Sequence, residues 1–145
     1  IYNAKSTKEL RKRVVDVAAS NGIKLLSKTK RGYDHGVFVP LMIMYPKADI
    51  PVIQISLESS MNPQRHYQLG VALSSLRKEG FMILGSGSSY HNMQGFFNGA
   101  GVKTDKYFEE DLAKICTNSG TDEDRVKALL NWKSLKYAVE CHPRE

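Results

Sequence analysis

The feature that most constrains the fold is a strand–helix–strand pattern in the middle of the chain. Residues 52–57 (VIQISL) are apolar and rich in β-branched residues, which predicts a buried strand. Asn62 and Pro63 then predict an N-cap and a first helical position, and apolar residues at helical spacing continue to Gly80. Residues 81–84 (FMIL) predict a second buried strand. Two strands joined through one helix normally form a parallel pair with a right-handed crossover, so the pattern predicts an α/β class.

Further elements are predicted before this unit. Ser6 and Glu9 form a capping box, which predicts the start of a helix, and Gly22 supplies the left-handed residue that ends it. Residues 23–27 predict a short strand and residues 28–36 a loop. These elements would add a helix and a strand to the central unit.

The last third of the chain predicts two helices, at residues 106–116 and, after a Thr121 cap, at residues 122–132. No internal repeat or linker interrupts the chain, so we expect residues 1–145 to belong to one domain. The predicted fold is α/β, with a central sheet of parallel strand–helix–strand units flanked by helices.

The charge of the chain is unevenly distributed. Residues 1–31 hold nine Lys or Arg against two Asp or Glu, whereas the other 114 residues hold twelve against thirteen. A nucleic-acid surface usually interleaves basic residues with aromatic ones, but the basic segment contains one aromatic residue, Tyr2. We therefore interpret the segment as the solvated face of a helix and expect no nucleic-acid partner.

The composition excludes several other classes. Hydrophobic residues make up 41% and charged residues 25% of the chain, which is typical of a globular protein and not of a disordered one. No apolar run approaches the roughly 18 to 20 residues that cross a bilayer, so no membrane partner is expected. The two cysteines, Cys116 and Cys141, are too few for a disulfide framework, which favours a reducing compartment, by default the cytoplasm.

His91 is the most informative of the four histidines. It lies in a loop that contains Gly85 and Gly87 and directly follows the predicted strand 81–84. Open α/β sheets bind ligands beyond the carboxyl ends of their strands, which makes His91 a candidate metal ligand or acid/base. A structural role in hydrogen bonding fits the pattern equally well. The loop matches neither the Gly-x-Ser-x-Gly elbow of hydrolases nor the Gly-x-Gly-x-x-Gly dinucleotide fingerprint.

The other three histidines carry weaker signals. His35 follows Asp34, and a carboxylate can orient an imidazole for proton transfer, although a plain loop histidine fits the spacing better. His66 falls in the first turn of the helix that Pro63 opens, where we expect a solvated side chain. His142 precedes a proline, and nothing local predicts what it faces.

Six stretches in a fixed order carry a resemblance to a known family. Taken together, they closely resemble the 4,5-DOPA extradiol dioxygenase family, which belongs to the class III, LigB-type ring-cleaving enzymes. The likeness is dense over residues 31–95 and thinner elsewhere. The stretches are RGYDHGVFVPLMIMYP at 31–46, ADIPV at 48–52, HYQLG at 66–70, LRKEG at 76–80, GSGSSYHN at 85–92 and HPRE at 142–145.

The resemblance implies roles for three histidines. The histidine of the HN pair binds the active-site metal in that family, which gives His91 this role. The histidine of the DHG motif is taken to act as acid/base toward the substrate, which points to His35. The histidine that begins the HP motif stands close to the site, so His142 is a catalytic candidate that supports the site or contacts the substrate. The implied cofactor is a divalent metal: Fe(II) for dioxygenase activity, with Zn(II) suited to the same ligands but without redox chemistry.

The chain also departs from the family pattern. The HGSP and SAHW segments, which carry the first two metal-binding histidines of the family, do not occur, and a further one follows HPxxE in relatives, beyond Glu145. An open metal site needs about three protein ligands, so one histidine is not enough. We therefore expect a partial catalytic-type domain, incomplete at both ends, whose uncovered faces favour association. Its partner would be the missing part of the same enzyme.

Two hypotheses on function follow. The first is that the chain is part of a metal-dependent extradiol dioxygenase, which cleaves a DOPA-like catechol with O₂. The alternative is an inactive remnant or a non-catalytic interaction domain that kept the fold without a complete metal site.

Overall fold

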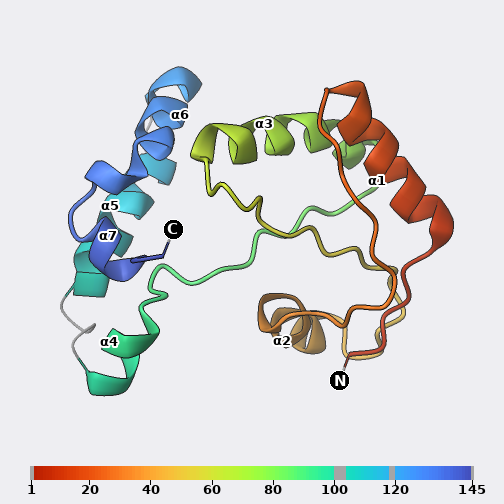
Figure 1. The fold of residues 1–145 in the computed structure, drawn as a ribbon, viewed down its shortest axis with the longest axis horizontal. Helices are drawn as coiled ribbons and strands as arrows, with labels where there is room; N and C mark the ends of the chain where they lie inside the picture. Colours follow the sequence, from red (N-terminus) through yellow and green to blue (C-terminus); the bar gives the residue numbers. More distant parts are fainter. Residues whose placement is uncertain (1, 100–103, 118–119, 145) are drawn as a thin grey trace. The chain divides into compact units, whose positions relative to one another are not determined.

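The computed structural model describes residues 2–99, 104–117 and 120–144, so that Glu145 of the HPRE motif lies outside the described residues. The chain divides into two compact units, residues 1–87 and 88–145. The expectation of one partial domain stays a prediction. The first unit holds helices α1 (Lys8–Ser20), α2 (His35–Met44) and α3 (Pro63–Leu73) and the 3₁₀ helix η1 (Ser74–Glu79) (Figure 1).

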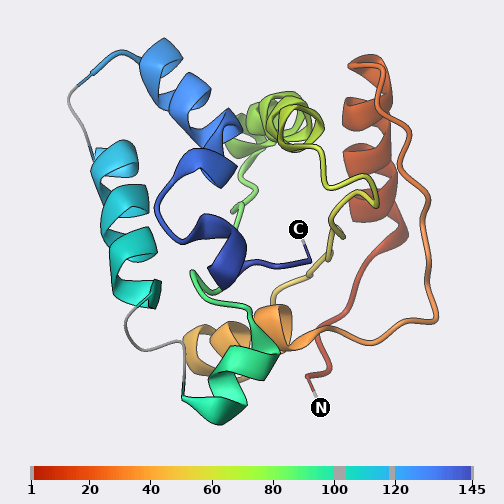
Figure 2. The ribbon, with the colours of Figure 1, turned by 60° about the vertical axis from the view of Figure 1, so that its left-hand side comes forward.

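The described residues of the second unit are mainly helical. It contains α4 (Met93–Asn98), α5 (Thr104–Thr117), α6 (Asp122–Leu130), the 3₁₀ helix η3 (Trp132–Ser134) and α7 (Ala138–Cys141) (Figures 1 and 2). Its core is formed by Phe108 of α5 and by Ala138 and Cys141 of α7. The residues packed around this core are Tyr90, Leu112, Trp132, Leu135 and Tyr137.

The core of the first unit joins its helices to three extended segments. Val14 and Val17 of α1 pack with Leu73 of α3 and Leu76 of η1. Each segment that the sequence predicts as a strand adds one side chain to this cluster, in the order Leu25, Ile53 and Phe81. The predicted strands thus lie along one layer of helices, as the strands of an α/β fold do.

The sheet itself is not confirmed. The part of the chain that the structure describes contains no strand, and segments 23–27, 52–57 and 81–84 are extended without a hydrogen-bonded ladder. The physical reason lies in where their amides bond. Ile23 N–H and Phe81 N–H donate back to the ends of the preceding helices, and Val52 N–H donates to Lys5 O at 3.0 Å. The first two N–H groups therefore cap helix ends, and the third bonds the segment before α1, so these three donors do not pair the predicted strands with one another.

The predicted helix boundaries agree with the structure where a local cap defines them. Asn62 caps α3 with Pro63 in its first turn, Thr121 caps α6, and Gly22 and Gly80 have φ of +75° and +84° after their helices. The capping-box prediction is off by one residue. Thr7 is the N-cap of α1, and its hydroxyl accepts from Leu10 N–H at 3.1 Å.

Helices α2, α4 and α7 were not predicted. Residues 35 and 36, expected in a loop, form the first turn of α2. No helix in the described part of the chain has both the length and the apolar character needed to cross a membrane.

Candidate functional site

The loop that carries His91 is joined to the end of the chain by main-chain and side-chain hydrogen bonds. His91 N–H donates to Cys141 O at 2.9 Å, and Asn92 Nδ2 donates to Glu140 O at 2.8 Å. The imidazole of His91 is on an exposed residue. The main chain of His91 is thus held by α7, and the residue as a whole is exposed.

Asn92 has a second function in the same loop. Its Oδ1 accepts from Gly95 N–H at 3.0 Å and so caps α4. Gly95 is buried, and a Cβ atom built on it would lie 2.0 Å from the Tyr90 hydroxyl. A larger residue at this position would therefore force the Tyr90 side chain to move.

His142 contacts the same loop through its side chain. Its Nε2 is 3.1 Å from Ser89 O, and because a carbonyl only accepts, Nε2 carries the proton. The ring makes edge contacts with Phe108 and Trp132, at centroid distances of 5.6 and 5.9 Å. Ser89 in turn donates its hydroxyl proton to Asp105 at 3.2 Å. His91 and His142 thus meet at one loop of the second unit: His91 belongs to this loop, and His142 bonds it through Ser89 O.

His35 belongs to the first unit and begins α2 after the N-cap Asp34. Its ring packs on Phe38 with centroids 4.8 Å apart. The Asp34 carboxylate is engaged elsewhere: Arg31 donates to both of its oxygens at 2.9 Å, and Gln54 donates to Oδ2. The Arg31 guanidinium first, and Gln54 second, lower the pKa of Asp34. Orientation of the His35 imidazole by Asp34, the weaker of the two interpretations of the sequence, is therefore not what these contacts show. The favoured interpretation, a loop histidine, is wrong as well, because His35 lies in the first turn of α2.

The start of α2 meets the first half of the glycine–serine loop. A Cβ atom on Gly36 would lie 3.6 Å from Ser86 Oγ and 3.7 Å from Ser86 O. Gly36 of the DHG motif and Ser86 of the GSGSSYHN loop are therefore neighbours within the first unit. The sequence could predict this only through the rule that loops after parallel strands share one edge of a sheet.

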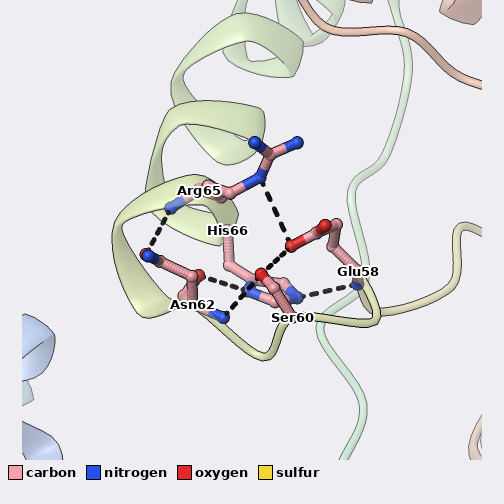
Figure 3. A network of polar contacts seen from close by, with 5 residues as sticks. All are labelled: Glu58, Ser60, Asn62, Arg65 and His66. Carbon is pink, nitrogen blue, oxygen red and sulfur yellow. Dashed lines mark hydrogen bonds and ion pairs between the residues drawn. The ribbon is translucent and has the colours of Figure 1, made fainter.

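His66 is not the solvated residue that the sequence predicted. It is half-buried, its Nδ1 donates to Asn62 O at 2.8 Å, and its Nε2 accepts from Glu58 N–H at 3.0 Å (Figure 3). Both ring nitrogens thus bond the main chain, which fixes a neutral tautomer. A histidine four residues after an N-cap can reach the cap's carbonyl, and this spacing is the signal that we missed.

The Glu58 carboxylate completes this turn. It accepts from the Ser60 hydroxyl and pairs with Arg65 Nε at 3.3 Å (Figure 3). The hydrogen bond from Ser60 is the main cause that lowers the pKa of Glu58. The turn 58–62, which follows a predicted strand, is therefore held by contacts within eight residues.

Tyr33 joins three segments of the first unit. Its hydroxyl lies 3.2 Å from Ala4 O and 3.1 Å from Val52 O, and burial, with a smaller contribution from Tyr2, raises its pKa. An open depression of about 1550 Å³ runs past Tyr33, Phe38 and His66. It exceeds the roughly 300 to 1,000 Å³ of a formed ligand pocket, so we do not identify it as one.

The described residues do not form a metal centre by themselves. Within residues 2–99, 104–117 and 120–144, no three His, Cys, Asp or Glu side chains lie together so that they could hold a metal ion. His91 can supply one imidazole nitrogen, and a complete mononuclear site needs further donors.

Comparison with known proteins identifies a family over the whole chain. The family model of the catalytic LigB subunit of aromatic ring-opening dioxygenases matches residues 1–145. This match supports an α/β fold class, of which the described residues show the helices and the extended segments. No solved structure gives a significant match.

Several relatives are similar over most of the chain. A 4,5-DOPA dioxygenase extradiol of Beta vulgaris is 48% identical over 95 residues, which are 65% of this chain and 35% of that protein. A protein of the same name from Escherichia coli is 39% identical over 142 residues, 98% of this chain and 47% of its own length. A 4,5-DOPA dioxygenase extradiol-like protein of Schizosaccharomyces pombe is 33% identical over 154 aligned residues, 100% of this chain and 51% of its own length. The chain thus spans about a third to a half of these relatives.

Proposed function

Because the chain belongs to the LigB family of aromatic ring-opening dioxygenases, we propose that it is part of an extradiol dioxygenase that cleaves a DOPA-like catechol with O₂. The match over all 145 residues is the observation that carries this proposal. The names of the relatives support the catechol class of the substrate. Both cysteines are unpaired, which supports a cytoplasmic location.

We assign His91 as a metal ligand and His35 as the residue that moves a proton at the substrate. The fixed main chain and exposed side chain of His91 suit a ligand that needs a defined position. His35 is exposed at the start of α2, and its ring rests on Phe38. These contacts leave the imidazole of His35 accessible to a substrate.

The cofactor that we expect is Fe(II), and Zn(II) suits the same kind of ligand. Ring-opening dioxygenases of this family are generally metal-dependent. Since His91 alone cannot hold the ion, we place the other donors in a part of the domain outside the described residues.

Exposed apolar side chains support a further part of the domain as the partner of this chain. Helix α2 is apolar around its whole circumference, a pattern that normally means burial, yet Ile43 is 80% exposed. Val39 and Met42 of the same helix are about half exposed. On the extended segments, Leu57 and Ile83 are also more than half exposed. The missing part of the enzyme would cover these side chains.

The test uses the full natural protein that contains these residues. We expect metal analysis to find a bound divalent ion, and a catechol added anaerobically to be cleaved when air is admitted. His91→Ala should abolish metal binding, whereas the matched control Gln94→Ala, an exposed residue of α4, should retain it. Full metal occupancy in His91→Ala would disprove the assignment of His91.

The second candidate, a non-catalytic interaction domain, is not favoured over the enzyme, because the incomplete donor set of the described residues is compatible with both. The intact mass of the natural protein separates the two. A product of about 250 residues, the size of one large domain, favours the enzyme. A metal-free protein that binds no catechol would favour the interaction domain.

A further inference from the structure

We propose that His142 is a positioning residue, which holds the backbone just before His91 through its bond to Ser89 O and does not itself contact the substrate. This inference rests on the proposed function, because the role of His142 is defined by that of His91. In this assignment the HP motif at residues 142–143 supports the loop that carries the HN pair at residues 91–92.

The hydrogen bonds between the two segments form one continuous clamp. We define this clamp as the bonds between residues 140–142 and residues 89–92, which lie about 50 positions apart in the sequence. Ser89 O accepts from His142 Nε2, His91 N–H donates to Cys141 O, and Asn92 Nδ2 donates to Glu140 O. Because the bonded residues lie before, at and after His91, its Cα atom cannot move without breaking the clamp.

The aromatic neighbours of His142 fix the direction of its ring. Phe108 and Trp132 contact it edge-on at 5.6 and 5.9 Å, and Phe108 is 2% exposed. A ring held in this way presents Nε2–H to Ser89 O at little further cost in side-chain entropy. While that bond lasts, Nε2 is not available to a substrate, which argues for a positioning role.

The loop is also anchored beyond Asn92. The side chain of Asn92 donates to Glu140 O with Nδ2 and caps α4 with Oδ1. Asn92→Asp would keep the cap acceptor, since aspartate is an equally good N-cap, but would lose the donor to Glu140. This substitution therefore separates the clamp from the helix cap.

The experiment compares His142→Phe with His142→Gln in the full natural protein. Phe keeps the aromatic packing but cannot donate, whereas Gln carries an N–H at a similar reach. One lost hydrogen bond corresponds to about a tenfold change in the opening equilibrium, so His91 N–H should exchange about tenfold faster in His142→Phe. In His142→Gln the exchange rate of His91 N–H should stay within about threefold of that of the parent. The exchange rates of the α5 amides should be unchanged in both variants.

Catechol turnover gives the second readout. Misplacement of a reacting group lowers kcat more than binding, so His142→Phe should lose at least about tenfold in kcat with KM within about threefold. Gln should restore kcat. A merely structural residue would instead lower the stability of the whole unit without this split.

Several results would overturn the proposal. Unchanged exchange of His91 N–H in His142→Phe would show that the ring does not hold the loop, and equal loss in the Phe and Gln variants would show that the donor is irrelevant. If His142→Phe does not fold, Asn92→Asp takes its place, and unchanged exchange there would count equally against the clamp. Absent catechol turnover in the parent protein would refute the proposed function, while the exchange data still decide whether the clamp exists.

Discussion

Two turns of this chain follow predicted strands, and each is fixed by a histidine ring that bonds the main chain. The turn 58–62 is held by His66, which is eight residues from Glu58. The loop 89–92 is held by His142, which is 53 residues from Ser89. The same chemical device is thus local in the first unit and long-range in the second.

This contrast shows which parts of the candidate site depend on contacts far away in the sequence. The turn 58–62 can form once the first turn of α3 has formed, because its hydrogen-bond partners, Arg65 and His66, lie within this first turn. The loop 89–92 takes its shape only when α7 has packed against α5. The position of the His91 main chain is therefore set by the packing of the second unit.

The largest expected effect comes from Phe108→Ala, which removes the ring that contacts both Trp132 and His142. Loss of a buried phenylalanine costs about 3 to 5 kcal/mol in the free energy of unfolding. Hydrogen exchange should become faster at His91 N–H and stay unchanged at Glu58 N–H. Urea unfolding and exchange measured on one sample test both statements.

Leu76→Ala is the matched control in the other unit. Leu76 is 3% exposed in the core of the first unit, and its truncation costs about 2 to 5 kcal/mol. Here His91 N–H should keep its exchange rate. If Leu76→Ala accelerates His91 N–H as strongly as Phe108→Ala does, the loop is not governed by its own unit and the comparison fails.

The next effect is that of Gly95→Ala, which tests the packing of the loop on α4. The new methyl group would lie 2.0 Å from the Tyr90 hydroxyl, so the ring has to move, and overpacking of this kind costs about 1 to 3 kcal/mol. Tyr90→Phe removes the hydroxyl oxygen that the new methyl group would overlap, so the double variant should recover part of the lost free energy of unfolding. Equal stability of Gly95→Ala and the parent in urea unfolding would contradict the tight contact.

The sequence predicted what short-range chemistry decides. The caps at Gly22, Asn62 and Thr121 were predicted correctly because each depends on residues within one helical turn. The capping box failed by one residue because Ser6 is bonded instead by Arg11, whose guanidinium contacts both its carbonyl and its hydroxyl. Neighbouring Ser and Thr compete for one cap, and their difference in energy is small.

Contacts far apart in the sequence were not predictable. Nothing around His142 indicates that its ring faces Ser89, because the partner lies 53 residues away. Helix α2 was missed because it is apolar on all sides, and its residues show no period that marks a helix. The predicted strands were recognised as extended segments, but their pairing depends on neighbours that no local pattern reveals. The roles of His35, His91 and His142 stay predictions that the experiments above test.

A smaller effect is expected from His66→Ala, which removes both bonds of the ring to the turn. A typical hydrogen bond contributes about 0.5 to 1.5 kcal/mol, and water can replace part of each bond because the ring is only half-buried, so the loss should lie in the lower part of the summed range, at about 1 to 2 kcal/mol. The control Gln64→Ala changes an exposed residue of the same helical turn and should be nearly neutral. His91 N–H should be unaffected, since its partners lie in the other unit. If His66→Ala is as neutral as Gln64→Ala, then the ring is not what holds the turn 58–62.

The smallest effect concerns the ion pair that joins α1 to η1. Arg13 donates to both carboxylate oxygens of Glu79, and this bond is the main cause that lowers the Glu79 pKa from 4.5. A carboxyl group whose folded pKa is lowered stabilises the fold above its unfolded pKa, and this contribution is lost as the pH falls through the folded pKa. Glu79→Gln should therefore be slightly less stable than the parent above pH 4.5 in urea unfolding, and the difference should vanish toward lower pH.

Arg13→Met should remove the same pH-dependent difference, and the double variant should add nothing to it, because the two groups act as one pair. Since the side chains of Arg13 and Glu79 are 47% and 36% exposed, added salt should shrink the effect. A difference that survives both acid and salt would show that the pair is not its source.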